Sequence, residues 1–132
     1  MRPDKSVVLD ASVIIALLNK EHTSKNINDL LPSAVISSVT YAEIINFYTQ
    51  RYNLEIDKIR DTIGSLISNI IAFDHIQAEI SGSISLQAKT YGLSLGDRAC
   101  IALGMHLGAP IFTADKIWAE LKLPNAEIIL IR

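Results

Sequence analysis

Four acidic side chains stand out because each follows a strand-like run and precedes an apolar, helix-like segment. They are Asp10, Glu43, Asp97 and Asp115. Carboxylate oxygens are ligands that Mg²⁺ and Mn²⁺ prefer, whereas zinc favours His and Cys. An ion held by such acids can activate a water molecule towards a phosphodiester and offset charge on the leaving oxygen. The residue types therefore predict metal-dependent phosphodiester hydrolysis, provided that the fold brings the acids together.

Each acid taken alone also has a structural explanation. Asp10 and Asp115 suit helix N-cap positions. Two other spacings read as capping boxes, Thr40-x-x-Glu43 and Ser94-x-x-Asp97, the second with Asp in place of Glu. Two carboxylates about 4 Å apart repel by about 4 kcal/mol at an effective dielectric constant of about 20. A cluster without a cation would raise the pKa values of its members and destabilise the fold, so four acids together favour a metal site over four separate caps.

The elements that must position these acids alternate between strands and helices. Strands are expected at 6–9, 34–37, 70–73, 110–112 and 127–130. Helices are expected at 11–18, 22–31, 41–52, 56–67 and 76–91, around the apolar segment that Asp97 opens, and shortly after Asp115. This order predicts an α/β fold, a parallel β-sheet of about five short strands flanked by helices on both faces. The crevice of such a sheet lies beyond the carboxyl ends of its strands, where all four acids fall.

Length and composition predict one folded domain over residues 1–132. The hydrophobic content is 49% and the formal net charge is −2, so no broad basic surface drives non-specific nucleic-acid binding. Cys100 is the only cysteine, which excludes an internal disulfide, and its apolar surroundings predict a core residue. No apolar run approaches the ~20 residues of a membrane span, and residues 1–5 do not begin a signal peptide, so we expect a cytoplasmic protein without membrane contact. The lack of a Gly-rich phosphate loop argues against a nucleotide cofactor.

Four segments carry a family resemblance. They read VVLDASVIIALL, SSVTYAEI, LSLGDRACIALG and IFTADKIWAEL. In this order and spacing they resemble the four acidic motifs of PIN-domain ribonucleases, most closely the VapC toxins of bacterial and archaeal toxin–antitoxin pairs. By that resemblance Asp10, Glu43, Asp97 and Asp115 match the catalytic, metal-binding acids. Thr113 matches the polar residue that helps orient that group, and Ser12 stands where members often carry a small polar residue.

The resemblance implies a PIN-like fold and an endoribonuclease that uses Mg²⁺ or Mn²⁺ to cleave single-stranded regions of RNA. It also implies a homodimer and a cognate VapB-type antitoxin that plugs the site. An apolar helical stripe fits a dimer or antitoxin surface and fits ordinary core equally well; it comprises Ile56, Ile59, Ile63, Leu66 and Ile67, beside the face from Tyr41 to Tyr52. A PIN-domain ribonuclease of RNA processing outside a toxin–antitoxin pair is the nearest alternative.

Other residues and reaction classes are weaker candidates. Arg98 and Lys116 each adjoin a site acid, and either could contact phosphate or pair with a neighbouring carboxylate. Trp118 is expected to pack rather than to stack on a base. A phosphohydrolase with Asp10 as covalent nucleophile is less favoured, because Ser12 stands where a second acid would be expected. A non-catalytic RNA- or protein-binding module on the same fold is disfavoured by the intact acids.

Overall fold

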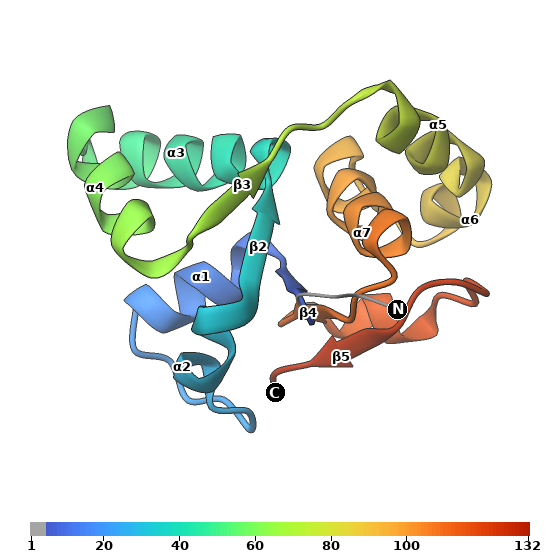
Figure 1. Ribbon diagram of the computed structural model, residues 1–132, viewed down its shortest axis with the longest axis horizontal. Helices are drawn as coiled ribbons and strands as arrows, with labels where there is room; N and C mark the ends of the chain where they lie inside the picture. Colours follow the sequence, from blue (N-terminus) through green and yellow to red (C-terminus); the bar gives the residue numbers. More distant parts are fainter. Residues whose placement is uncertain (1–4) are drawn as a thin grey trace.

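A five-stranded parallel sheet forms the centre of the computed structural model, which describes residues 5–132 (Figure 1). The strand order is β3-β2-β1-β4-β5, and every pair of neighbours is parallel. The strands are β1 (Val7–Leu9), β2 (Ala34–Ser37), β3 (Asn69–Ile71), β4 (Ile111–Thr113) and β5 (Ile128–Leu130). The α/β class and the parallel sheet predicted from the sequence are confirmed.

Helices connect the strands and cover the sheet. The α-helices are α1 (Ala11–Leu18), α2 (Ile27–Leu30), α3 (Ser38–Tyr52), α4 (Ile56–Leu66), α5 (His75–Ser83), α6 (Ser85–Thr90) and α7 (Leu95–Leu107). Two short 3-10 helices are η1 (Leu31–Ser33) and η2 (Lys116–Glu120). Figure 1 shows α1, α3 and α4 on one side of the sheet and α5, α6 and α7 on the other. None of the helices among the described residues has the length and apolar character needed to cross a membrane.

Alternation along the strands divides the apolar side chains between two cores, one on each face of the sheet. In β1, Leu9 packs into the core beneath α1, α3 and α4, whereas Val8 packs into the core beneath α7. In β2, Ile36 and Val35 divide in the same way. Successive strand residues point to opposite faces, so this division is what a sheet covered on both sides requires. Trp118 is fully buried in the second core, which confirms the packing role predicted for it.

The helix predicted at 22–31 is wrong over most of its length. The chain leaves α1 through Lys20, whose φ is 55°, and the Lys20 and Glu21 N–H groups bond back to carbonyls of the last helical turn. The following loop is then held by the end of the chain, because the Ser24 N–H donates to the Ile131 carbonyl at 2.6 Å. A left-handed helix end and a long-range backbone contact have no periodic sequence signal. Only α2 remains, capped by the Asn26 side chain.

Other element boundaries differ by smaller amounts. The helix predicted at 76–91 is broken at Ile84, whose backbone lies off the helical region at φ −101° and ψ 9°, so α5 and α6 are separate. Helix α3 begins at Ser38, with Ser37 as its cap, which makes the predicted Thr40–Glu43 capping box wrong. Strand β3 covers 69–71 rather than 70–73. The hydrophobic periodicity of a sequence defines the ends of helices and strands poorly, since tertiary contacts determine where these elements stop.

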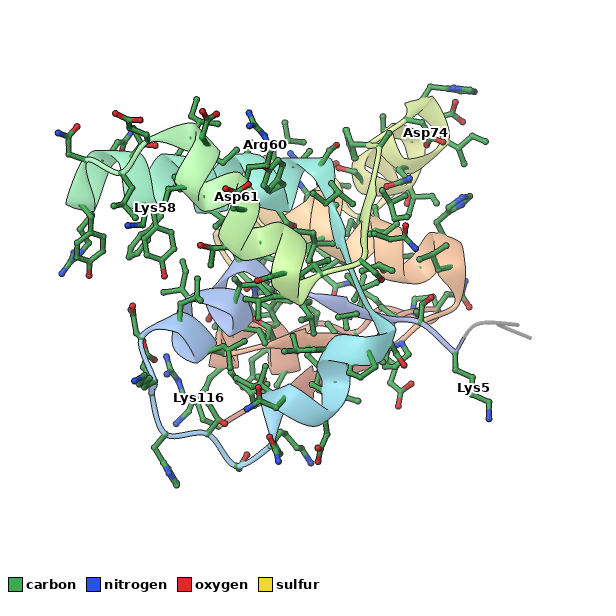
Figure 2. All side chains as sticks on the ribbon, turned by 60° about the vertical axis from the view of Figure 1, so that its left-hand side comes forward. Lys5, Lys58, Arg60, Asp61, Asp74 and Lys116 are labelled. Atoms are coloured by element: carbon green, nitrogen blue, oxygen red, sulfur yellow. The ribbon has the colours of Figure 1, made fainter. Side chains whose placement is uncertain are left out.

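The apolar stripe on α4 is mostly ordinary core. Ile59, Ile63 and Ile67 are each at most 4% exposed and pack against α1 and α3. Ile56 and the neighbouring Tyr52 are the exceptions, at 52% and 50% exposed. Lys58, Arg60 and Asp61 of α4, labelled in Figure 2, are exposed. The stripe is therefore a buried face with a small exposed apolar end.

Candidate active site

Asp10 leaves the carboxyl end of the central strand β1 and enters the polar edge of the sheet. It holds the N-cap position of α1, yet its side chain makes no capping hydrogen bond. Instead its Oδ2 accepts hydrogen bonds from the Ser12 hydroxyl at 2.7 Å and from the Thr113 hydroxyl at 3.0 Å. The residue is 5% exposed. The structure thus assigns Asp10 to a buried polar network rather than to the helix start.

The same two hydroxyls join the loop after β1 to the loop after β4. The Ser12 oxygen accepts from the Ala114 N–H at 2.9 Å, and the Thr113 oxygen accepts from the Asp115 N–H at 3.1 Å. Each hydroxyl therefore donates to Asp10 and accepts from the neighbouring loop. Two segments about a hundred residues apart in sequence are held in one arrangement around the Asp10 carboxylate.

Glu43 lies in the second turn of α3 and reaches the same region from the neighbouring strand. Its half-buried carboxylate makes no hydrogen bond or ion pair with any described residue. It lies against the first turn of α7, where a Cβ at Gly96 would stand 2.2 Å from Glu43 Oε2. Burial, followed by the charges of Asp10 and Asp97, raises the pKa of Glu43 to about 7. Glu43 is therefore a close, unanchored neighbour of both aspartates.

Asp97 combines the capping position predicted for it with a place beside the other acids. Its Oδ2 accepts from the Ser94 N–H at 2.9 Å, while the Ser94 hydroxyl accepts from the Asp97 N–H at 3.1 Å. The predicted Ser94–Asp97 capping box is thus confirmed. One carboxylate oxygen is used by the cap, and the negative charge of the group still acts on Asp10 and Glu43.

Asp115 lies at the rim of this group. It caps η2 by accepting a hydrogen bond from the Ile117 N–H at 3.1 Å, as predicted for an N-cap, and it is exposed. Its charge is not among the causes that shift the pKa of Asp10 or Glu43. Its link to the site runs through its own N–H and Thr113. The structure therefore brings three of the predicted acids together and places the fourth beside them.

Asp10, Glu43 and Asp97 repel one another, and no positively charged side chain among residues 5–132 forms an ion pair with them. Burial raises the pKa of Asp10 despite the hydrogen bonds from Ser12 and Thr113, and the charge of Asp97 raises it further. Burial, followed by the charges of Asp10, Glu43 and Asp97, also raises the pKa of the Cys100 thiol. Cys100 is thus a buried residue directly behind the acids, which confirms the core position predicted for it.

Neither Arg98 nor Lys116, the two predicted phosphate contacts, forms an ion pair with a site acid. Arg98 Nη1 donates to the Ser81 carbonyl of α5 at 3.3 Å, and Lys116 is exposed at the start of η2. The ion pairs recorded over residues 5–132 join Arg60 to Asp57 and Arg132 to Glu21, so neither includes a site acid. Figure 2 shows Lys5 directed outward from the body of the protein.

The donor set fits a hard divalent cation, although the ligands are not yet assembled around one. All candidate ligands are oxygens, which Mg²⁺ and Mn²⁺ prefer. No group of three or more His, Cys, Asp or Glu side chains in residues 5–132 is arranged to hold a metal ion as it stands. In this structure, Asp97 and Asp115 each use one carboxylate oxygen to accept a capping hydrogen bond, so those two oxygens are not directed at a common point.

Gly96 is the site residue to which sequence reasoning gave no role. It lies in the first turn of α7, where glycine is a poor helix former and its φ is not positive. A glycine inside the expected helix, next to a candidate acid, was the available signal. The partner across the gap, Glu43, lies more than fifty positions away and was not visible from spacing.

The PIN-domain family model matches residues 7–123 of the sequence. The chain therefore belongs to the PIN-domain family, as the resemblance of its acidic motifs predicted. The match includes the four acids, Ser12 and Thr113. No curated protein matches the sequence.

Solved structures repeat the fold over almost the whole chain. VapBC2 from Rickettsia felis, in a structure with a DNA fragment from its promoter, is similar to this chain with a TM-score of 0.74 and 18% sequence identity. The match covers 96% of this chain and 98% of that chain. DNA-bound VapBC from Salmonella typhimurium has a TM-score of 0.71 and 18% identity over 95% and 97%. VapBC-5 from Mycobacterium tuberculosis, of a toxin–antitoxin family, has a TM-score of 0.62 and 20% identity over 96% and 99%.

Proposed function

We propose that this protein is a metal-dependent endoribonuclease that cleaves phosphodiester bonds in single-stranded regions of RNA. The observation that carries the proposal is the meeting of Asp10, Glu43 and Asp97, with which no Lys, Arg or His side chain among residues 5–132 forms an ion pair. Burying like charges together costs free energy, so a protein keeps such a group where a cation completes it. RNA as the substrate follows from the PIN-domain motifs and their order.

In this proposal Asp10 and Asp97 hold Mg²⁺ or Mn²⁺, with Glu43 and Asp115 as the adjoining ligands. The ion, when bound, lowers the pKa of a water molecule and offsets negative charge on the phosphodiester. Ser12 and Thr113 keep Asp10 in one orientation, since both hydroxyls donate to its Oδ2. Glu43 has no hydrogen-bond partner among the described residues and a pKa of about 7, so in the metal-free protein its carboxyl group can hold a proton near neutral pH.

The direct test is RNA cleavage by purified protein with Mg²⁺, with Mn²⁺ and with EDTA. We expect cleavage with either ion and none after chelation, with product ends that map to single-stranded regions. Full activity in chelated protein would contradict the metal requirement. Asp10→Asn separates the two alternative functions. A phosphohydrolase with Asp10 as nucleophile would form a phosphorylated protein intermediate in the wild type and lose it in the variant. A binding module would keep its RNA affinity, and neither the wild type nor the variant would cleave RNA.

The partners follow from the structural neighbours. Several of the similar structures are of VapBC or toxin–antitoxin complexes, so we propose a VapC-type toxin that a cognate VapB-type antitoxin inhibits in the cytoplasm. The uncompensated acids are a suitable target for an antitoxin Arg or Lys side chain, because a cation there relieves the same repulsion as the metal. RNA cleavage undiminished in a purified complex would exclude this mode of inhibition.

A homodimer is part of the same proposal. Exposed apolar side chains lie at the end of α3, at the start of α4 and on α5 to α7; they include Tyr52, Ile56, Ile76, Leu86 and Leu95. Side chains of this kind gather at subunit interfaces. Light scattering at micromolar concentration is expected to give twice the chain mass. A monomer mass would remove the dimer and leave the nuclease assignment standing, in which case an RNA-processing role outside a toxin–antitoxin pair gains support.

A further inference from the structure

Gly96 is unusual among the helical glycines because a carboxylate occupies the place of its missing side chain. A Cβ there would stand 2.2 Å from Glu43 Oε2, 2.6 Å from Glu43 Cδ and 3.1 Å from Glu43 Oε1. Gly64 in α4 and Gly82 in α5 have nothing within 4 Å of the same position. The absence of a side chain at position 96 therefore leaves the space that the Glu43 carboxylate occupies.

Backbone conformation does not explain this glycine. The glycines with positive φ are Gly92 and Gly108, whereas Gly96 has ordinary helical geometry inside α7. Alanine is the better helix former at such a position. Since neither φ nor helix propensity favours glycine at 96, the contact with Glu43 is the physical reason that remains.

Glu43 depends on this space because no hydrogen bond or ion pair within the described part of the chain anchors its carboxylate. Asp10 is held by two hydroxyls and Asp97 by its capping box, but Glu43 makes no hydrogen bond or ion pair with the described residues. Its position is set by packing against the first turn of α7. A methyl group at 96 would push the end of a flexible side chain, so the Glu43 carboxylate moves and the backbone stays.

We propose that Gly96 is a positioning residue, which admits the Glu43 carboxylate to the acid group and thereby sets the affinity of the site for a divalent cation. The inference rests on the proposed function, since the cation is the one proposed above. Outer partners of metal ligands commonly change metal affinity by roughly ten- to hundredfold when altered. Gly96 acts in this way by leaving room rather than by making a bond.

The test compares Gly96→Ala with Gly64→Ala, a matched glycine-to-alanine change on an open helix surface. We expect Gly96→Ala to weaken Mn²⁺ binding, measured by calorimetry, by about tenfold or more, with the metal-free melting temperature unchanged or raised. Gly64→Ala is expected to leave Mn²⁺ affinity unchanged. A purely structural role for Gly96 would lower the metal-free melting temperature instead, and that result, or unchanged Mn²⁺ affinity, overturns the proposal.

Glu43→Asp supplies the compensating change, because its carboxylate is one methylene shorter and retreats from position 96. We expect Glu43→Asp to weaken Mn²⁺ binding in the wild-type background and to cause no further loss beside Gly96→Ala. Equal losses in both backgrounds would show that the two residues act independently and refute the inference. If wild-type protein binds no Mn²⁺, the proposed function fails by itself. A metal-free crystal structure of Gly96→Ala then decides the inference, by whether Glu43 has moved.

Discussion

Replacing Asp97 by Asn separates two roles of one side chain. Asp97 Oδ2 accepts the Ser94 N–H in the capping box, and its negative charge raises the pKa values of Asp10 and Glu43. Asn keeps a side-chain oxygen that can accept the same hydrogen bond, but it carries no charge. The helix start is therefore retained while the acid group loses one member.

The expected magnitudes differ sharply between folding and catalysis. Loss of an acid from the first turn of a helix costs about 0.3–1 kcal/mol in interaction with the helix dipole. Loss of the Asp97 charge also relieves its repulsion of Asp10 and Glu43, which offsets part of this cost; burial contributes more than Asp97 to raising both pKa values. We expect the metal-free unfolding free energy to change by less than about 1 kcal/mol. RNA cleavage should fall ~100-fold or more, as for other losses of a preorganised electrostatic group.

The assay pairs urea unfolding without metal with cleavage of a single-stranded RNA at limiting Mg²⁺. Ser94→Ala is the crossed control, since it removes the hydroxyl that accepts the Asp97 N–H and keeps the charge of the site. It should cost about 1 kcal/mol of unfolding free energy and leave most of the cleavage rate. Wild-type cleavage by Asp97→Asn, or an equal loss of activity in both variants, would refute the catalytic reading of Asp97.

Three further predictions address the rest of the site. The pKa of Glu43 is raised from 4.5 to about 7, so its contribution to the stability of the metal-free protein should be fully present below pH 4.5. About 1–2 kcal/mol of unfolding free energy should be lost as the pH rises through 7, after allowance for solvent screening. Urea unfolding at several pH values should show a flatter pH dependence for Glu43→Gln than for the wild type. Thr113→Val leaves the Asp10 carboxylate and the Asp115 N–H each short of a partner, so unfolding free energy should fall by about 1–3 kcal/mol in urea; an unchanged value would show that the hydroxyl network is dispensable. Mn²⁺ at about 100 times its dissociation constant should stabilise the fold by about 2.7 kcal/mol in thermal unfolding, and no shift would count against a cation site.

Sequence periodicity was sufficient for the sheet and for the edge at which the acids meet. Runs such as 34–37 have a buried, β-branched character, and each is followed by helix-like spacing, so strand ends and acids fall together. The hydroxyls of Ser12 and Thr113 were expected near Asp10 from the resemblance to PIN domains. Their bonding pattern, with each donating to Asp10 and accepting from the loop after β4, required coordinates.

Two misplaced features have different causes, one a long-range backbone contact and the other a choice between neighbouring helix caps. The 22–31 segment has enough apolar residues for a helix, but Ser24 and Lys25 bond to the carbonyl of Ile131 at the other end of the chain. The capping box assigned to Thr40 fails because Ser37 caps α3 one turn earlier. Several Ser and Thr residues compete for that position, and spacing alone does not rank them.

The four acids differ in how their surroundings hold them, and this difference explains how the fold tolerates their proximity. One carboxylate oxygen of Asp97 and one of Asp115 accept capping hydrogen bonds. Asp10 accepts hydrogen bonds from two hydroxyl groups, so all three acids have stabilising contacts in the metal-free protein. Glu43 has no such contact with residues 5–132, and its pKa of about 7 means that it takes up a proton more readily than an ordinary Glu. Protonation of Glu43 thus removes repulsion in the absence of metal, and a cation removes it otherwise. Glu43 is the acid without such a contact and also the acid that lies against Gly96. The space at Gly96 therefore controls the carboxylate that must lose its proton and adjust its position when a cation binds.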